Sequence, residues 1–173
     1  IDIHIQDALG RTWQCGTIQL DMQLPKRFEL SYIDADGSKR EPIMIHRVIY
    51  GSLDRFLGIM TENFAGAFPL WLAPIQVEVI NISEKQNEYA EAVTTALDKA
   101  GIRVEFDRRN EKVGYKIREA QLQKIPYMLI LGDEEVAEQT VTVRHRKLGD
   151  LGKFKLDDLI KLLQNEIQTK EIK

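Results

Sequence analysis

Residues 77–106 read VEVINISEKQNEYAEAVTTALDKAGIRVEF, and this stretch decides the fold of the second half of the chain. Its first six residues, 77–82, are mostly apolar and rich in β-branched side chains, which favours a strand. Ser83 is placed to cap a helix, and Gly101 is placed to end it. A second strand is expected at 103–106. Strand, helix and strand in this order begin a doubly wound α/β pattern.

The chain after residue 106 continues the same alternation. The expected order is a helix at 113–124, a strand at 126–131, a turn at Gly132-Asp133, a strand at 139–145, a glycine-bearing loop at 148–153 and an amphipathic C-terminal helix at 156–168. The last strand looks antiparallel to the others. We therefore expect a three-layer α/β/α domain with a mixed sheet.

The first third of the chain has the period-2 alternation of β-strands. Strands are expected at 1–5, 12–21, 28–33 and 43–49, with a turn at 7–11 and an Asp-Gly hairpin turn at 34–37. Because short turns join these four strands, we expect them to form one antiparallel sheet.

A helix is expected after this sheet. Gly51 breaks the period, Ser52 is a plausible N-cap, and the helix should fade at Gly66. The next segment, 68–74, is aromatic and twice interrupted by proline. We interpret it as a packed connector and expect two domains, 1–74 and 75–173.

Composition narrows the function classes. The 173 residues are 43% hydrophobic and 29% charged, which excludes a mainly disordered chain. No stretch is long and apolar enough for a membrane-spanning helix. The formal net charge of −3 argues against a bulk cationic nucleic-acid binder, but it leaves room for a local basic patch. The chain opens at Ile1 inside an expected strand, so we expect that an upstream part is missing.

The turn at 51–55 is a candidate anion site. A strand runs into Gly51, and Arg55 lies in the first turns of the helix that follows. A guanidinium beside a helix N-terminus suits phosphate. The alternative is a solvated arginine paired with Asp54 or Glu62.

His46 and Cys15 are the residues here that suggest a metal. One histidine and one cysteine fall short of the three or four ligands that zinc takes. From the residues alone, a buried, hydrogen-bonded histidine is the simpler interpretation. The lone Cys15 cannot form an internal disulfide and fits a reducing compartment.

Residues 103–118 hold six basic and three acidic side chains, with Phe106 and Tyr115 between them. A second basic cluster lies at 144–147. Cations interleaved with rings suit single-stranded nucleic acid. A solvated face, its charge offset by neighbours such as Glu111 and Glu119, is the alternative.

Longer strings are more specific than these patterns. They are WQCGTIQLD at 13–21, MIHRVIYGSLDRF at 44–56, FAGAFPLWLAP at 64–74, and NEKVGYKIRE at 110–119 with IPYML at 125–129. In that order they resemble the late catalytic strands, motif 3, the linker and the anticodon-binding domain of the threonyl-tRNA synthetase family. The resemblance runs the whole length. It implies the remnant of a class II catalytic sheet with its motif 3 helix, followed by an α/β/α anticodon-binding domain.

The resemblance also implies roles for single residues. Arg55 matches the motif 3 arginine that packs against ATP, while Gln14, Gly51 and Ser52 match positions beside ATP and the aminoacyl-adenylate. His46 matches one of three zinc ligands, and zinc in that family engages the threonine hydroxyl. In the anticodon domain the matching positions are Asn110, Lys112, Arg118, Glu135 and Arg144.

The implied function is ATP-dependent charging of tRNA(Thr) with threonine by a cytoplasmic homodimer, with zinc as cofactor and ATP with magnesium as substrate. Motif 2 and two further zinc ligands are expected upstream of Ile1. The chain alone is therefore expected to bind the anticodon arm of tRNA without catalysing, and without membrane association. A stand-alone anticodon-binding module and a small-anion-binding α/β domain remain alternatives.

Overall fold

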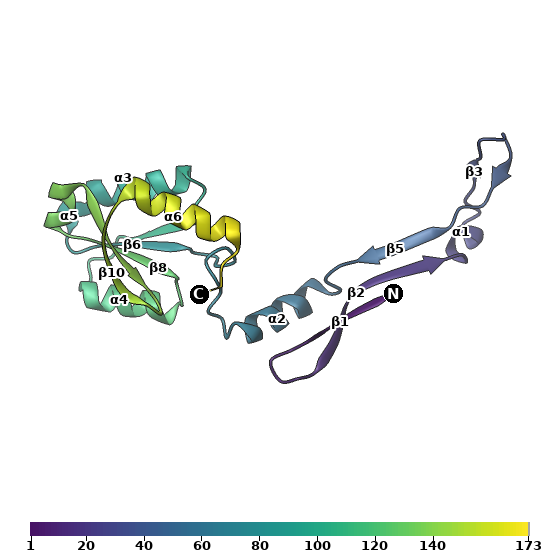
Figure 1. Cartoon of the computed structure of the whole chain (residues 1–173), viewed down its shortest axis with the longest axis horizontal. Coiled ribbons are helices and arrows are strands. Elements are labelled where there is room, and N and C mark those ends of the chain that lie inside the picture. Colours follow the sequence, from purple (N-terminus) through teal and green to yellow (C-terminus); the bar gives the residue numbers. More distant parts are fainter. Residues whose placement is uncertain (173) are drawn as a thin grey trace. The chain divides into compact units, whose positions relative to one another are not determined.

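The computed structural model describes residues 1–172 and divides into two compact units, Ile1–Ala65 and Gly66–Lys173 (Figure 1). Each unit has its own sheets and helices, so each is described separately.

The second unit is built on a five-stranded mixed sheet. Its strands are β6 (Val77–Asn81), β7 (Val104–Asp107), β8 (Tyr127–Leu131), β9 (Thr140–His145) and β10 (Gly149–Lys155), in the order β10-β9-β8-β6-β7. β6 pairs in parallel with β7 and β8, whereas β9 is antiparallel to both of its neighbours. The predicted mixed sheet is confirmed.

Helices cover both faces of this sheet. They are a short 3-10 helix (Glu84–Gln86), α3 (Asn87–Lys99), α4 (Val113–Leu122), α5 (Asp133–Glu138) and α6 (Leu156–Thr169). Strand residues such as Val79 and Leu129 pack with α3 and α6 in one core, and Ile80 and Met128 pack with α4 in another. The alternation of strand side chains therefore builds two cores, and the predicted three-layer domain is confirmed (Figure 1).

Local signals at α3 act as expected. The backbone N–H of Ser83 donates to Gln86 Oε1 at 2.8 Å, one half of a capping box. Gly101 has φ +79°, a conformation that favours glycine, and the N–H of Ile102 reaches back to the carbonyl of Leu97.

Two expectations for the second unit were wrong. Residues 149–155 form β10 instead of a loop: Gly149 and Gly152 both have positive φ, and a register shift lies between Asp150 and Gly152. Glycine at a bulge does not end a strand. The Gly132-Asp133 turn is the start of the unexpected helix α5, where Gly132 N–H donates to Glu135 Oε2 at 2.8 Å.

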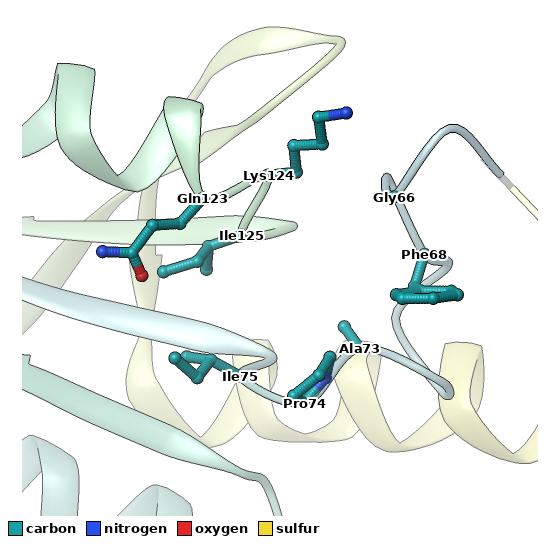
Figure 2. Close-up of a pocket in the computed structure, with 8 residues that line it drawn as sticks. All are labelled: Gly66, Phe68, Ala73, Pro74, Ile75, Gln123, Lys124 and Ile125. Carbon is teal, nitrogen blue, oxygen red and sulfur yellow. The ribbon is translucent and has the colours of Figure 1, made fainter. Parts of the chain in front are cut away.

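The connector belongs to the second unit, so the division falls ahead of it instead of at residue 74. Leu70 is fully buried in the core, and its carbonyl accepts a hydrogen bond from Gln76 Nε2 at 2.8 Å. Arg146 donates to the carbonyls of Ala67 and Phe68. The connector and the loop after α4 enclose a pocket of about 80 Å³ (Figure 2).

The first unit is a smaller assembly. Its elements are β1 (Asp2–Gln6), β2 (Thr12–Asp21), α1 (Leu24–Arg27), β3 (Tyr32–Ile33), β4 (Lys39–Arg40), β5 (Met44–Val48) and α2 (Leu53–Asn63). The strands β1, β2 and β5 form an antiparallel sheet in the order β1-β2-β5. β3 and β4 make a separate hairpin around the expected Asp-Gly turn.

The prediction of one four-stranded sheet was therefore wrong. The expected strand at 28–33 is only two residues long, because Phe28 and Leu30 instead donate backbone hydrogen bonds that close α1. Glu29 between them has φ +53°. In the described part of the chain, no helix is both long and apolar enough to cross a membrane.

Candidate functional site

The turn before α2 brings three of the expected adenylate-site residues together. Gly51 has φ +66°, and a Cβ there would lie 3.1 Å from the carbonyl oxygen of Cys15 and from Arg55 Nη2. The backbone conformation and the close approach of Arg55 both therefore favour glycine at this position. Arg55 Nη2 donates to the carbonyl of Gln14 at 2.9 Å.

Arg55 is exposed, as its alternative interpretation expected, but the ion pair with Asp54 or Glu62 was wrong. Among the described residues, Glu62 pairs with Arg11 at 3.3 Å, and Arg55 instead lies over the ring of Trp13, 5.7 Å from its centroid. Ser52 occupies the N-cap position of α2, but its hydroxyl makes no capping hydrogen bond. The structure thus places the arginine on a carbonyl and a ring instead of on a carboxylate.

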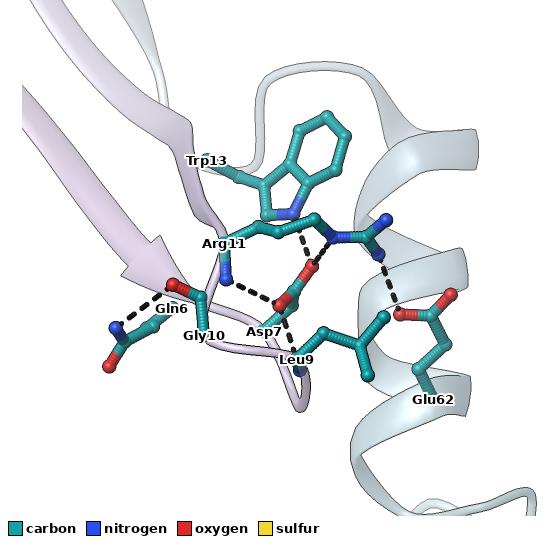
Figure 3. A network of polar contacts seen from close by, with 7 residues as sticks. All are labelled: Gln6, Asp7, Leu9, Gly10, Arg11, Trp13 and Glu62. Atoms are coloured by element: carbon teal, nitrogen blue, oxygen red, sulfur yellow. Dashed lines mark hydrogen bonds and ion pairs between the residues drawn. The ribbon is translucent and has the colours of Figure 1, made fainter.

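Sequence reasoning missed a caged carboxylate, that of Asp7, which is hydrogen-bonded to the same Trp13 over which Arg55 lies (Figure 3). Asp7 accepts hydrogen bonds from Trp13 Nε1 at 2.7 Å, from Arg11 Nε at 2.6 Å and from the backbone N–H groups of Leu9 and Arg11. The hydrogen bond from Trp13, followed by those from Arg11, holds the pKa of Asp7 far below its usual range. Its position in a DALGR turn gave no signal of this role.

His46 lies apart from that corner, on β5. Its Nε2 is 3.1 Å from Asp21 Oδ2, and its side chain is 43% exposed. The interpretation as a buried histidine was therefore wrong, although the histidine is hydrogen-bonded. With Gln19 and Arg27, it lines an open pocket of about 650 Å³.

The described residues do not form a complete zinc site by themselves. The part of the chain that the structure describes contains no group of three or more His, Cys, Asp or Glu side chains arranged to hold a metal. Cys15 is buried in β2. One imidazole beside one carboxylate falls short of a zinc site.

Most of the basic segment is already engaged within the second unit. Arg108 pairs with Glu91 at 2.6 Å, and Arg109 pairs with Asp107 at 2.8 Å. Arg103 donates to backbone carbonyls of the connector. Acidic side chains therefore do offset the positive charge of this segment, as the solvated-face alternative expected. The ion-pair partners are Glu91 and Asp107 instead of Glu111 and Glu119.

Lys116 is one of the six basic residues of 103–118, but sequence reasoning did not predict that it is buried. It is 2% exposed, and its Nζ donates to Asn81 Oδ1 at 2.6 Å and to the carbonyl of Asp107 at 3.0 Å. Burial lowers the pKa of Lys116. The signal was present, because residue 116 falls on the same helical stripe as the buried-face residues Val113 and Ala120.

The candidate RNA residues divide by exposure. Asn110, Lys112 and Arg118 are exposed on α4 and the loop before it. Arg144 on β9 alternates with Val143, which packs into the α3 and α6 core, so Arg144 faces the side of the sheet that carries α4. Its Nε is buried and has no hydrogen-bond partner within residues 1–172.

Glu135 is a structural acceptor as well as a candidate ligand. Its Oε2 accepts from Gly132 N–H, and its Oε1 accepts from Thr142 Oγ1 at 2.7 Å. Burial alone would raise the pKa of Glu135, but these two hydrogen bonds outweigh it and lower the pKa. Thr142 and Arg144 share a strand face, so the fold brings an anion and a cation to one side of the sheet.

Comparison with known families decides what this domain is. The family model described as "Anticodon binding domain" matches residues 76–166. The chain belongs to the anticodon-binding domain family. Ahead of the anticodon-binding domain, residues 1–64 match "tRNA synthetase class II core domain (G, H, P, S and T)".

Curated relatives extend the match along the chain. It is 64% identical over 172 residues to threonine–tRNA ligase from Caldanaerobacter subterraneus subsp. tengcongensis, and 61% identical over 170 residues to threonine–tRNA ligase from Clostridium novyi. The matches cover 99% and 98% of this chain but 27% of each relative. The chain with its anticodon-binding domain is homologous to the C-terminal region of threonine–tRNA ligases.

A solved structure supports the same assignment. The RNA-binding domain of threonyl-tRNA synthetase from Cryptosporidium parvum Iowa II is 42% identical to this chain, with a TM-score of 0.81. The match covers 95% of this chain and 42% of that one. The sequence resemblance to the threonyl-tRNA synthetase family is confirmed.

Proposed function

We propose that the second unit binds the anticodon arm of a tRNA, with tRNA(Thr) as the cognate partner. The observation that carries the proposal is the anticodon-binding domain match over residues 76–166. The structure adds a sheet face whose central arginine, Arg144, has a buried and unpartnered Nε. Buried donors are seldom left without a partner, so this face is a candidate for a ligand whose acceptors hydrogen-bond to Arg144.

Each candidate residue has a distinct chemical role in this proposal. Arg118 and Lys112 are exposed cations suited to backbone phosphates, which supply affinity without sequence preference. Arg144, Asn110 and Glu135 have the planar donor and acceptor groups that read the edges of unstacked bases. Because Arg108 and Arg109 are paired internally, we expect them to contribute little.

The test is the affinity of this chain for a labelled anticodon stem-loop of tRNA(Thr). Arg144→Ala should weaken binding by about tenfold or more, since a bidentate base contact is worth on the order of 1–3 kcal/mol. Arg118→Ala should weaken binding and reduce the salt slope by about one. Lys99→Ala, an exposed charge at the end of α3 on the opposite face, is the matched control and should leave both unchanged. Unchanged binding by both arginine variants would refute the proposed interface.

For the protein of which this region is part, we propose the activity of a threonine–tRNA ligase. In that enzyme Arg55 would contact ATP, supplied with magnesium, and Gln14, Gly51 and Ser52 would border the adenylate. This chain's contribution is positional: the carbonyl of Gln14 and the ring of Trp13 hold the Arg55 guanidinium at the turn. His46 would supply one zinc ligand, and the described residues provide no complete set.

For the whole enzyme we further propose threonine as the substrate, a homodimer and a cytoplasmic location. Threonine-dependent ATP–pyrophosphate exchange tests the proposed activity. We expect no exchange from this chain alone, because its described residues provide no complete metal set and Arg55 is the single arginine proposed to contact ATP. Exchange by these 173 residues would contradict that expectation, whereas stem-loop binding without exchange would agree with it.

A further inference from the structure

A second polar pocket lies toward the β7 edge of the sheet, away from the strand that carries Arg144. It has a volume of about 430 Å³ and is lined by residues of β6, β7, the loop after β7 and the end of α4. Those residues include Glu78, Glu105, Asp107, Arg109 and Gln123. None of the residues proposed for RNA binding or for the adenylate site lines this pocket.

Glu78 is the unusual member of this pocket. It is 7% exposed, and its Oε2 is buried without a hydrogen-bond partner anywhere in the described residues. Leaving a buried acceptor unpaired is costly, so a native site with one is a candidate for an absent ligand. Burial, and then the negative charge of Asp107, raise the pKa of Glu78 to about 7.

Glu105 adds a second carboxyl group to the pocket beside Glu78. It is the register partner of Glu78 in the parallel pairing of β6 with β7, so both carboxyls project from the same face of neighbouring strands. Such strands are about 4.8 Å apart. Two carboxyl groups at this spacing can share one cation.

The arginines beside this pair form their ion pairs with other carboxylates. Arg109 donates twice to Asp107, at 2.9 and 2.8 Å. Arg108 donates to Glu91 of α3. With these arginines engaged, Glu78 and Glu105 are the carboxyls lining the pocket that form no ion pair within residues 1–172, although the charges of Arg109 and Lys116 act on Glu78.

We propose that this pocket binds the alkylammonium or guanidinium group of a small organic cation, whose N–H donors bridge Glu78 and Glu105. A divalent metal is the poorer occupant, because the described residues offer no group of three metal-binding side chains here. An ammonium needs only acceptors placed around it, and charge-assisted hydrogen bonds to carboxylates are strong. The proposal does not rest on the proposed RNA binding.

The test is an amide NMR titration of the whole chain with n-butylammonium chloride at pH 7.5. Saturable shifts are expected at residues 78, 105 and 123. Tetramethylammonium chloride, which has the same charge but no N–H donor, should give none. Glu78→Gln should weaken n-butylammonium binding by about tenfold or more. Glu88→Gln, an equal change of charge on α3 at the opposite face, should leave it unchanged.

The pH profile gives a second readout. Binding should strengthen as the pH rises from 6 to 8, because the cation needs Glu78 ionised, and the Glu78→Gln variant should lose that dependence. The charged groups facing Glu78 are Asp107, Arg109, Glu105 and Lys116. Absence of saturable shifts, equal shifts with tetramethylammonium, unaltered binding by Glu78→Gln, or shifts with magnesium chloride alone would each overturn the proposal.

Discussion

The two units of the chain differ in how much apolar surface they bury. In the second unit Val79, Leu129 and Val143 are fully buried, and the core continues on both faces of the sheet. In the first unit Leu20 and Ile45, which face each other across β2 and β5, are 66% and 63% exposed. Among the described residues the first unit buries little more apolar surface than Cys15 and Ile59.

This difference shows which unit can stand alone. A sheet packed on both faces has the core of an independent domain. An apolar sheet face left open marks a surface that other protein covers. The second unit therefore has the properties of a self-sufficient module, and the first those of one part of a larger domain, in agreement with relatives of which this chain spans 27%.

The largest expected effect contrasts a leucine from each unit. Leu129→Ala empties a position at the centre of the five-stranded sheet and should destabilise the second unit by about 3 kcal/mol. Leu20→Ala removes a side chain that is already exposed and should cost less than about 0.5 kcal/mol. Urea unfolding measures both, followed by the amide signals of β8 for Leu129→Ala and by those of β2 for Leu20→Ala. Equal losses would erase the contrast.

The connector gives the next largest effect. Arg146 donates to the carbonyls of Lys124, Ala67 and Phe68, so Arg146→Ala should loosen residues 66–74 by about 2 kcal/mol. Hydrogen exchange should become faster at the amides of Leu72 and Ala73 and stay unchanged in β1 and β2. If exchange does not change at the connector, then the connector is not held by this arginine.

Within the first unit, order should depend on the caged carboxylate. Asp7→Asn replaces an acceptor of four hydrogen bonds, so the amides of Leu9 and Arg11 should exchange about tenfold faster. Because the pKa of Asp7 is lowered, its ionised form should keep the loop ordered at pH values where ordinary aspartates are half protonated. An acid titration of these amides tests the point, and melting near pH 4 would contradict it.

The smallest effect concerns Glu78. A raised carboxyl pKa means that the folded protein loses stability as the pH rises from the unfolded value of 4.5 through about 7. Glu78→Gln should remove that loss, so that its advantage over the parent chain grows by about 1 kcal/mol between pH 6 and pH 8. Thermal unfolding at the two pH values measures it; a constant difference would show that Glu78 is ionised throughout.

Local signals in the sequence predicted much of the fold. Ser83 caps the 3-10 helix that runs into α3, Gly101 follows the end of α3 as predicted, and the alternation over 12–21 matched β2. Glycine led to one wrong prediction. Gly149 and Gly152 suggested a loop, but they lie in a strand whose Leu151 and Phe154 pack on the core. Whether a glycine ends a strand or bends it depends on the neighbouring strand, which the local sequence does not show.

The candidate sites were less predictable because tertiary contacts decide which charges are free. Arg108, Arg109 and Arg118 look alike in the sequence, yet the first two are paired with acids and the third is exposed. The cage around Asp7 joins residues of a turn, a strand and a distant helix. The resemblance to family strings singled out Arg55 and Gln14, and in the structure Arg55 Nη2 donates to the carbonyl oxygen of Gln14 at 2.9 Å.

The central claim is that RNA binding resides in the second unit alone. The direct measurement compares residues 66–173 with the whole chain for affinity to the tRNA(Thr) anticodon stem-loop at one salt concentration. We predict a folded fragment with an affinity within about twofold of the whole chain, since a difference below about 0.4 kcal/mol is not significant. A folded fragment that has lost binding, with Arg118 and Arg144 intact, would contradict the account.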